Sequence, residues 1–106
     1  MRESDAKSLL AFISRMGMYI FEEDKENIRS FLTGYEVGSL GECCFTEMLS
    51  NKLEEKYKIK KYATGWSDQV ERYAGQSNID WQQAFQLVAS EVLGEITNQQ
   101  NSESKT

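Results

Sequence analysis

The stretch DWQQAFQLVASEVLGEI, residues 80–96, decides the fold class of this protein. Asp80, followed three positions later by Gln83, forms a capping box, in which each side chain accepts a hydrogen bond from the other residue's backbone amide. Behind this box, apolar side chains recur every three or four positions, which places them on one face of a helix. They belong to Trp81, Phe85, Val88, Val92 and Ile96. The stretch therefore predicts an amphipathic helix that ends near residue 96.

Two earlier segments carry the same helical spacing. The first covers residues 4–17, and either Ser4 or Asp5 can cap it. The second starts near Asp24, where acidic residues suit a helix N-terminus, and ends around Gly34 and Gly38. The apolar stripes are Leu9, Phe12, Ile13 and Met16 in the first segment, and Ile28, Phe31, Leu32 and Tyr35 in the second.

Two more helices are expected in the middle of the chain. Ser39 with Glu42 fits another capping box and predicts that the longest helix begins there and runs into a lysine-rich end at residues 56–61. Thr64-Gly65 breaks the pattern, and a short helix over 66–74 follows.

These segments predict an all-α fold, a compact bundle of about five helices in a single domain over residues 1–96. The complete absence of proline fits helices better than a sheet-rich or loop-rich protein. Residues 97–106 are polar and lack apolar anchors, so we expect a disordered tail there.

Histidine is also absent, which excludes several classes of site within this chain. Catalysis by a Ser–His–Asp or Cys–His arrangement needs an imidazole, and so do histidine-based zinc sites. Glycine-rich phosphate loops are not found either. We therefore expect no metal, no cofactor and no enzymatic activity.

Cys43 and Cys44 are the two cysteines, and they are adjacent. Neighbouring cysteines rarely form a disulfide because the geometry strains the peptide between them. Reduced thiols, a charged start without a signal peptide, and no apolar run long enough for a membrane span together predict a cytoplasmic protein. At least one thiol is interpreted as a small buried apolar group, with a redox or metal role as the alternative.

The charge pattern points to a protein partner. Net charge is −5, and residues 22–47 hold seven acids against two bases. Such a surface opposes nucleic-acid binding and can steer a basic partner, although solvated helix faces remain the simpler interpretation. The steering candidates are Glu22, Glu23, Asp24, Glu26 and Glu36. The run of lysines and tyrosines over 56–62 is compatible with nucleic acid, but lysines at a helix C-terminus explain it more simply.

Two aromatic residues lie beside glycines and are candidate anchors for a partner. Tyr35 follows Gly34, and Trp66 follows Gly65. Exposed aromatics of this kind often dominate a protein interface. The alternative is that both side chains close the core of the bundle.

Pairs of carboxylates at helical spacing leave an enzyme open as a further alternative. Glu22 with Glu26, and Glu91 with Glu95, are separated by one helical turn. Acid–base catalysis would require one member of such a pair to be desolvated, in a concave pocket that holds a buried acid.

The segments SFLTGYEVG (30–38) and GWSDQV (65–70), in a short, acidic, histidine-free helical chain, resemble the small immunity proteins that accompany bacterial polymorphic toxins. The similarity is greatest to the immunity proteins of contact-dependent growth inhibition systems. The chain is also similar in size and acidity to the colicin nuclease immunity proteins, but it lacks their tandem-tyrosine helix.

The resemblance implies a cytoplasmic inhibitor that binds the C-terminal toxin domain of a delivered effector, and the expected activity of that domain is a nuclease. Neutralisation would then occur by covering the toxin's basic substrate-binding surface. The main alternative is an acidic adaptor or regulatory subunit that binds a host protein.

Overall fold

The computed structural model describes the backbone of residues 2–20, 22, 24–40 and 42–104, with side chains described as far as residue 97. Over these residues the fold is all-α and contains no strand, as the sequence predicted. The elements are α1 (Glu3–Ser14), a 3₁₀ turn η1 (Met16–Met18), α2 (Lys25–Gly38), α3 (Phe45–Glu55), α4 (Trp66–Ser77) and α5 (Trp81–Ser104).

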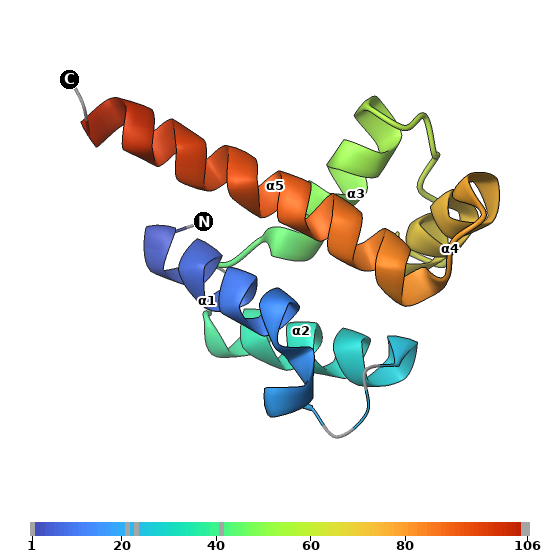
Figure 1. Cartoon of the computed structure of the whole chain (residues 1–106), viewed down its shortest axis with the longest axis horizontal. Coiled ribbons are helices and arrows are strands. Elements are labelled where there is room, and N and C mark those ends of the chain that lie inside the picture. The colour runs from blue at the N-terminus through green and yellow to red at the C-terminus, as the bar shows by residue number, and fades with distance from the viewer. Residues whose placement is uncertain (1, 21, 23, 41, 105–106) are drawn as a thin grey trace.

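Helix α5 is the centre of the molecule, and α1, α3 and α4 pack against it (Figure 1). It runs antiparallel to α1. Its capping box is confirmed: the Gln83 amide donates to Asp80 Oδ1 at 2.7 Å. The first four turns of α5 supply fully buried core residues, namely Ala84, Phe85, Val88, Ala89 and Leu93.

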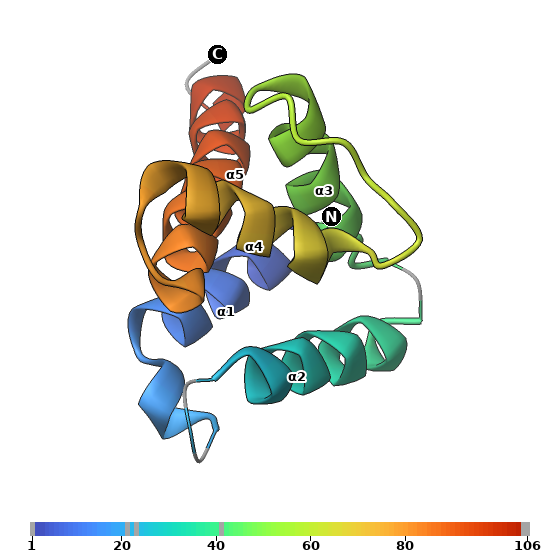
Figure 2. The same cartoon turned by 90° about the vertical axis from the view of Figure 1, so that its right-hand side faces the viewer.

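Helix α2 lies on the other side of α1 from α5 (Figure 2). Large side chains fill the space between the backbones of α1 and α2. The rings of Phe12 on α1 and Phe31 on α2 stack with centroids 3.9 Å apart. Ile28 and Leu32 are buried beside them. The attachment of α2 therefore depends on a few large side chains rather than on close backbone packing.

The predicted boundaries of the first helix need correction. Arg2, and neither Ser4 nor Asp5, occupies the N-cap position of α1. The helix ends at Ser14, and the chain then forms η1, which buries Met16. Asp5 is itself buried, and its carboxylate is engaged by another helix, so it is not free to cap α1.

The predicted start of the third helix at Ser39 is wrong. Ser39 is the C-cap of α2, and its hydroxyl donates to the Glu36 carbonyl at 2.7 Å while accepting from the Cys43 amide at 3.0 Å. Helix α3 begins at Phe45, where Glu36 of α2 supplies the cap. A capping box requires its serine to be free, and here the end of α2 occupies it.

Helix α3 is also shorter than predicted, because it ends at Glu55 and leaves the lysine-rich residues 56–61 outside the helix. Lys58 has a left-handed backbone (φ 60°), which turns the chain back and buries Ile59. The Ile59 amide then donates to the Leu53 carbonyl at 3.0 Å. The free energy gained by burying the Ile59 side chain accounts for the end of α3 before this residue.

The last two helices are longer than predicted. Helix α4 continues to Ser77, and Asn78 ends it in the left-handed conformation (φ 57°). The Ile79 amide donates to the Ala74 carbonyl at 3.1 Å, the bond that defines a Schellman motif. Helix α5 continues past residue 96 to Ser104, since no glycine or proline interrupts residues 97–104. The expected irregular tail is thus helical as far as the described backbone extends.

Within the described residues, no helix combines the length and apolarity that a membrane span requires.

Candidate functional site

Most of the predicted partner-binding residues belong to α2 or the turn before it. The structure separates them into three groups: acids around the helix N-terminus, Tyr35 over a pocket near the C-terminus, and Glu36 in a bond to α3. Trp66 lies elsewhere, at the start of α4. Glu23 lies outside the described residues.

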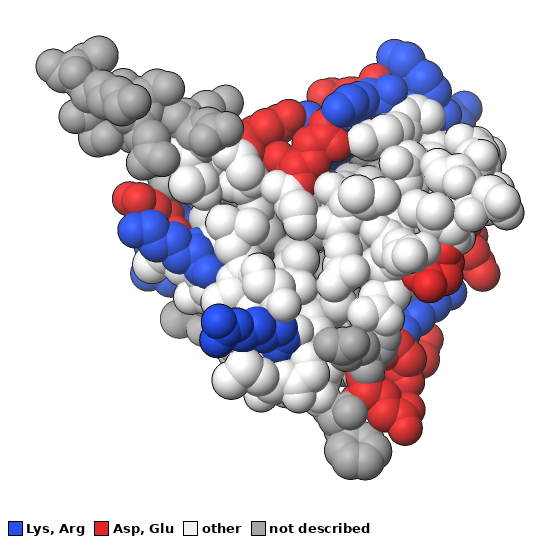
Figure 3. All heavy atoms as spheres, in the orientation of Figure 1, with Lys and Arg blue, Asp and Glu red and all other residues white. Residues whose placement is uncertain are grey.

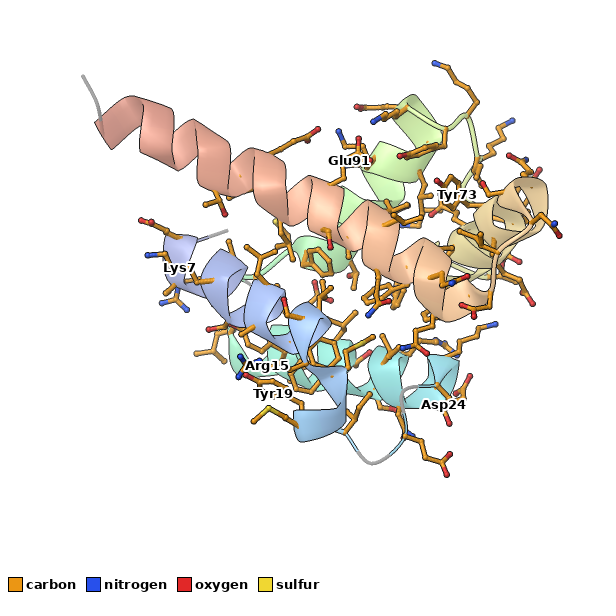
Figure 4. The ribbon with its side chains drawn as sticks, viewed as in Figure 1. Lys7, Arg15, Tyr19, Asp24, Tyr73 and Glu91 are labelled. Atoms are coloured by element: carbon orange, nitrogen blue, oxygen red, sulfur yellow. The ribbon has the colours of Figure 1, made fainter. Side chains whose placement is uncertain are left out.

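The acids at the start of α2 are exposed (Figure 4 labels Asp24). The helix starts near Asp24 as predicted, and Asp24 is its N-cap: its Oδ1 accepts from the Asn27 amide at 2.8 Å. Glu26 pairs with Arg29 at 3.1 Å. The backbone carbonyl of Glu22 accepts from Asn27 Nδ2 at 3.1 Å. Glu22 itself is exposed.

Helix α4 brings a further acid to this end of α2. Glu71 pairs with Lys25 at 3.6 Å, and its side chain remains 64% exposed. Figure 3 shows acidic side chains gathered along this edge, while the centre of the face over α5 carries almost no charge. We call Glu22, Asp24, Glu26 and Glu71 the acidic edge. Sequence reasoning missed Glu71, because only the packing of α4 brings it close to α2.

Tyr35 is half-buried and closes the contact between α2 and α1. Its hydroxyl donates a hydrogen bond to Asp5 Oδ1 at 2.8 Å. Arg2 Nε lies 3.3 Å from the other oxygen of Asp5 and 3.0 Å from Glu42. Tyr35 is therefore attached to a buried acid, not presented as a free anchor.

A pocket of about 310 Å³ opens at this contact, lined by Arg2, Asp5, Gly34, Tyr35, Gly38 and Ser39. Gly34 and Gly38 were expected to bracket the end of this helix; Gly38 is its last residue, whereas Gly34 lies within α2. A Cβ added to either glycine would meet nothing within 4 Å. The two glycines thus leave open space above the backbone of α2.

The carboxylate of Asp5 is held ionised. The Tyr35 hydroxyl bond is the strongest influence that keeps the pKa of Asp5 below its ordinary value, and Arg2 adds to it against the opposing effect of burial. Burial and the bond to Asp5 raise the pKa of Tyr35. At neutral pH the pocket therefore contains a negative charge beside a neutral phenol, and the guanidinium of Arg2 shows that this charge accepts a cation.

The sequence contains a signal for Asp5 that the residue-by-residue reading missed. Asp5 precedes Leu9 by four positions, so it lies on the same face as Leu9, Phe12 and Met16. An acid on the apolar face of a helix needs a buried partner. Sequence spacing alone could not identify that partner as Tyr35.

Glu36 has a structural role. Its Oε1 accepts from the Thr46 hydroxyl at 2.7 Å, and its Oε2 accepts from the Thr46 amide at 3.1 Å. A carboxylate at this position satisfies a free amide of the first turn and complements the positive end of the helix dipole. The charge of Glu36 is committed to α3, away from the acidic edge.

Trp66 packs into a group of aromatic rings, in agreement with the alternative that it closes the core. Its ring centroid lies 6.0 Å from that of Trp81 and 5.9 Å from that of Phe85. Trp81 in turn stacks on Phe85 at 5.5 Å and donates from Nε1 to the Ser67 carbonyl at 3.0 Å. These contacts join the start of α4 to the start of α5.

The two carboxylates on α5 bind side chains of α3 and of the residues that directly follow it. Glu91 accepts from the Tyr57 hydroxyl at 2.6 Å and from Lys56, and Figure 4 shows it on α5 beside α3. Glu95 pairs with Lys52 at 2.7 Å. Lys56 and Tyr57 help to keep the pKa of Glu91 below its ordinary value, although burial opposes them. Glu91 therefore lacks the raised pKa of a general acid.

The two cysteines agree with the interpretation that at least one thiol is a small buried apolar group. Cys43 is buried and Cys44 half-buried, and the two are not joined in a disulfide. Burial raises the pKa of Cys43, which makes its thiol less reactive. In the described part of the chain, no three or more Cys, Asp and Glu side chains gather as a metal site would require.

Comparison of the chain with protein-family models, with curated proteins and with solved structures found no match in any of the three.

Proposed function

We propose that the protein binds a basic protein domain through the exposed surface of α2, with the acidic edge steering the approach. The observation that carries this proposal is the pairing of Lys25 with Glu71, which brings an acid of α4 to the end of α2 where Glu22, Asp24 and Glu26 are exposed. Two elements distant in sequence contribute acids to one edge, and these acids outnumber Lys25 and Arg29. Charge arranged in this way raises association rates with a partner of opposite charge.

The resemblance of segments 30–38 and 65–70 to contact-dependent growth inhibition immunity proteins supports a specific partner. We propose the C-terminal toxin domain of such an effector, a nuclease being the activity that would supply a basic surface. Bound α2 would cover that surface and exclude nucleic acid by charge and shape.

The kinetic test compares two double charge reversals. Glu22→Lys with Glu71→Lys changes the acidic edge, whereas Glu54→Lys with Glu55→Lys makes the same change in net charge on exposed positions of α3. Asp24 is left intact because it caps α2. We expect the first variant to lower the association rate much more than the second, with little effect on dissociation. Equal effects of the two variants would contradict local steering.

The identity of the partner is tested in cells. The chain is produced together with the C-terminal domain of a large exported protein encoded by a neighbouring gene. We expect growth to be rescued and the activity of the toxin to be lost. Failure of rescue, together with charge-dependent binding to a host protein, would favour the adaptor alternative.

Asp5 is the observation that favours an enzyme, because it is a buried acid in a concave pocket. A catalytic acid at neutral pH needs a raised pKa, whereas Tyr35 and Arg2 hold the pKa of Asp5 down. These contacts suit cation binding better than proton transfer. We therefore keep binding as the proposed function.

A further inference from the structure

The pocket between α1 and α2 combines a buried charge with open space. The side chain of Asp5 is only 6% exposed, yet its carboxylate lines a pocket of about 310 Å³. The Tyr35 hydroxyl donates to Oδ1 at 2.8 Å, Arg2 Nε lies 3.3 Å from Oδ2, and the backbone of Arg2 gives the carboxylate a further hydrogen bond. A carboxylate accepts more bonds than these, and short bonds to a cation are its strongest.

The group that already contacts Oδ2 is a guanidinium. Arg2 is 59% exposed, precedes the first turn of α1, and divides Nε between Asp5 and Glu42. Arg2 is the exposed member of this pair, and a guanidinium from a partner would replace the bond that Arg2 gives up, so Arg2 can be displaced at small cost. In the free protein, the side chain of Arg2 therefore occupies the position at Asp5 Oδ2 and is held weakly there.

The wall opposite Asp5 is open because α2 presents glycines there. Gly34 and Gly38 are one helical turn apart, and both line the pocket. Beside them, the exposed side chains of Val37 (71%) and Leu40 (91%) provide apolar surface at the same end of α2. A long side chain with an apolar stem and a charged head fits such a combination.

We propose that Asp5, Tyr35, Gly34 and Gly38 form a socket for an arginine side chain of the protein partner, and that Arg2 occupies the socket in the free protein. This inference rests on the proposed function and names the anchor of its interface. Arginine is expected rather than lysine, because the planar guanidinium can donate two parallel hydrogen bonds to a carboxylate. An ammonium group lacks this geometry.

The socket can be tested without the partner. Nα-acetyl-L-arginine amide is titrated into the full chain, and the backbone amide resonances of Gly34, Tyr35 and Gly38 are followed by NMR. We expect saturable shifts at these residues, weaker shifts with the lysine analogue, and none with the neutral citrulline analogue. Equal responses to arginine and citrulline would overturn the proposal.

Three variants separate the socket from general charge effects. Arg2→Gln removes the internal occupant and is expected to tighten binding of the arginine probe about two- to fivefold. Gly34→Leu fills the pocket without changing charge and is expected to abolish binding. Gly75→Leu, at an open position on α4, is the matched control and is expected to bind normally. Asp5→Asn should also abolish binding, but Gly34→Leu keeps the test valid if that variant does not fold.

The outcomes distinguish the socket from the proposed function. Undiminished probe binding by Gly34→Leu, or weaker binding by Arg2→Gln, would overturn the socket. If the acidic-edge variants still slow association with a basic partner in that case, the proposed function stands without the socket. Specific shifts that Gly34→Leu abolishes and Gly75→Leu retains would support the socket.

Discussion

The hydroxyl of Tyr35 donates a hydrogen bond to Asp5 across 2.8 Å, and this bond joins α2 to α1 over a separation of 30 residues. Few other polar contacts hold α2 in place, since most of its attachment comes from apolar side chains. The same bond supplies one wall of the pocket proposed to bind a partner. Stability and binding are therefore linked at this position.

Tyr35→Phe should destabilise the protein by about 1–3 kcal/mol, because it leaves a buried carboxylate short of a donor. Tyr62→Phe is the matched control, since the ring of Tyr62 is exposed and packs on Arg72 through its face. We expect the control to change stability by less than about 0.5 kcal/mol. Urea unfolding followed by circular dichroism measures both. Equal losses of unfolding free energy in the two variants would show that the Tyr35–Asp5 bond does not stabilise the protein.

The stability of the protein should fall with acid in a way that depends on Tyr35. The pKa of Asp5 is lower in the folded protein than in the unfolded chain, so the unfolded chain binds the proton first as pH falls below about 4. The stabilising contribution is present above that pH and is lost as pH falls through the folded pKa. In Tyr35→Phe the pKa is lowered less, so this loss is smaller.

The measurement is the difference in free energy of unfolding between wild type and Tyr35→Phe from pH 7 to pH 3. Other acids titrate in both proteins and cancel in the difference. We expect the difference to shrink on acidification. A constant difference over this range would contradict the assigned cause of the shift.

Gln69 should be one of the least replaceable residues in the core. It is fully buried, its Oε1 accepts from the Ser50 hydroxyl at 2.6 Å, and its Nε2 donates to the Ile59 carbonyl at 2.9 Å. Gln69→Leu leaves both partners without a bond and should cost about 1–3 kcal/mol despite its similar volume. Gln76→Leu, on the exposed face of α4, should be nearly neutral. Similar melting temperatures for the two variants would refute the role of this network.

Glu36→Ala should act on α3 rather than on partner steering. Loss of the cap at Thr46 is expected to cost about 0.5–2 kcal/mol and to speed amide exchange in the first turn of α3. Glu54→Ala, which removes an exposed acid from the same helix, controls for the change in charge. Exchange rates at Phe45 to Glu47 give the readout. Unchanged protection there, with slower partner association, would restore the steering role first expected for Glu36.

The sequence by itself determined the helical class and the parts of each helix that depend on near neighbours. The capping box of Asp80 and Gln83 forms as predicted, and the second helix starts near Asp24 as predicted, with Asp24 as its N-cap. Their bonds span three residues, so local sequence is sufficient to specify them. Periodic apolar stripes likewise identified the core face of α5 before any packing was known.

Only the tertiary structure decided which polar groups meet. Ser39 and Glu42 carry the signature of a capping box, yet α3 takes its cap from Glu36, ten residues before Thr46. Asp5 finds Tyr35, and Glu71 reaches Lys25, because helices distant in sequence pack side by side. Spacing along one helix fixes which face a residue occupies, but not which element covers that face. The acidic edge and the pocket at Asp5 are therefore products of packing, since each combines side chains from more than one helix.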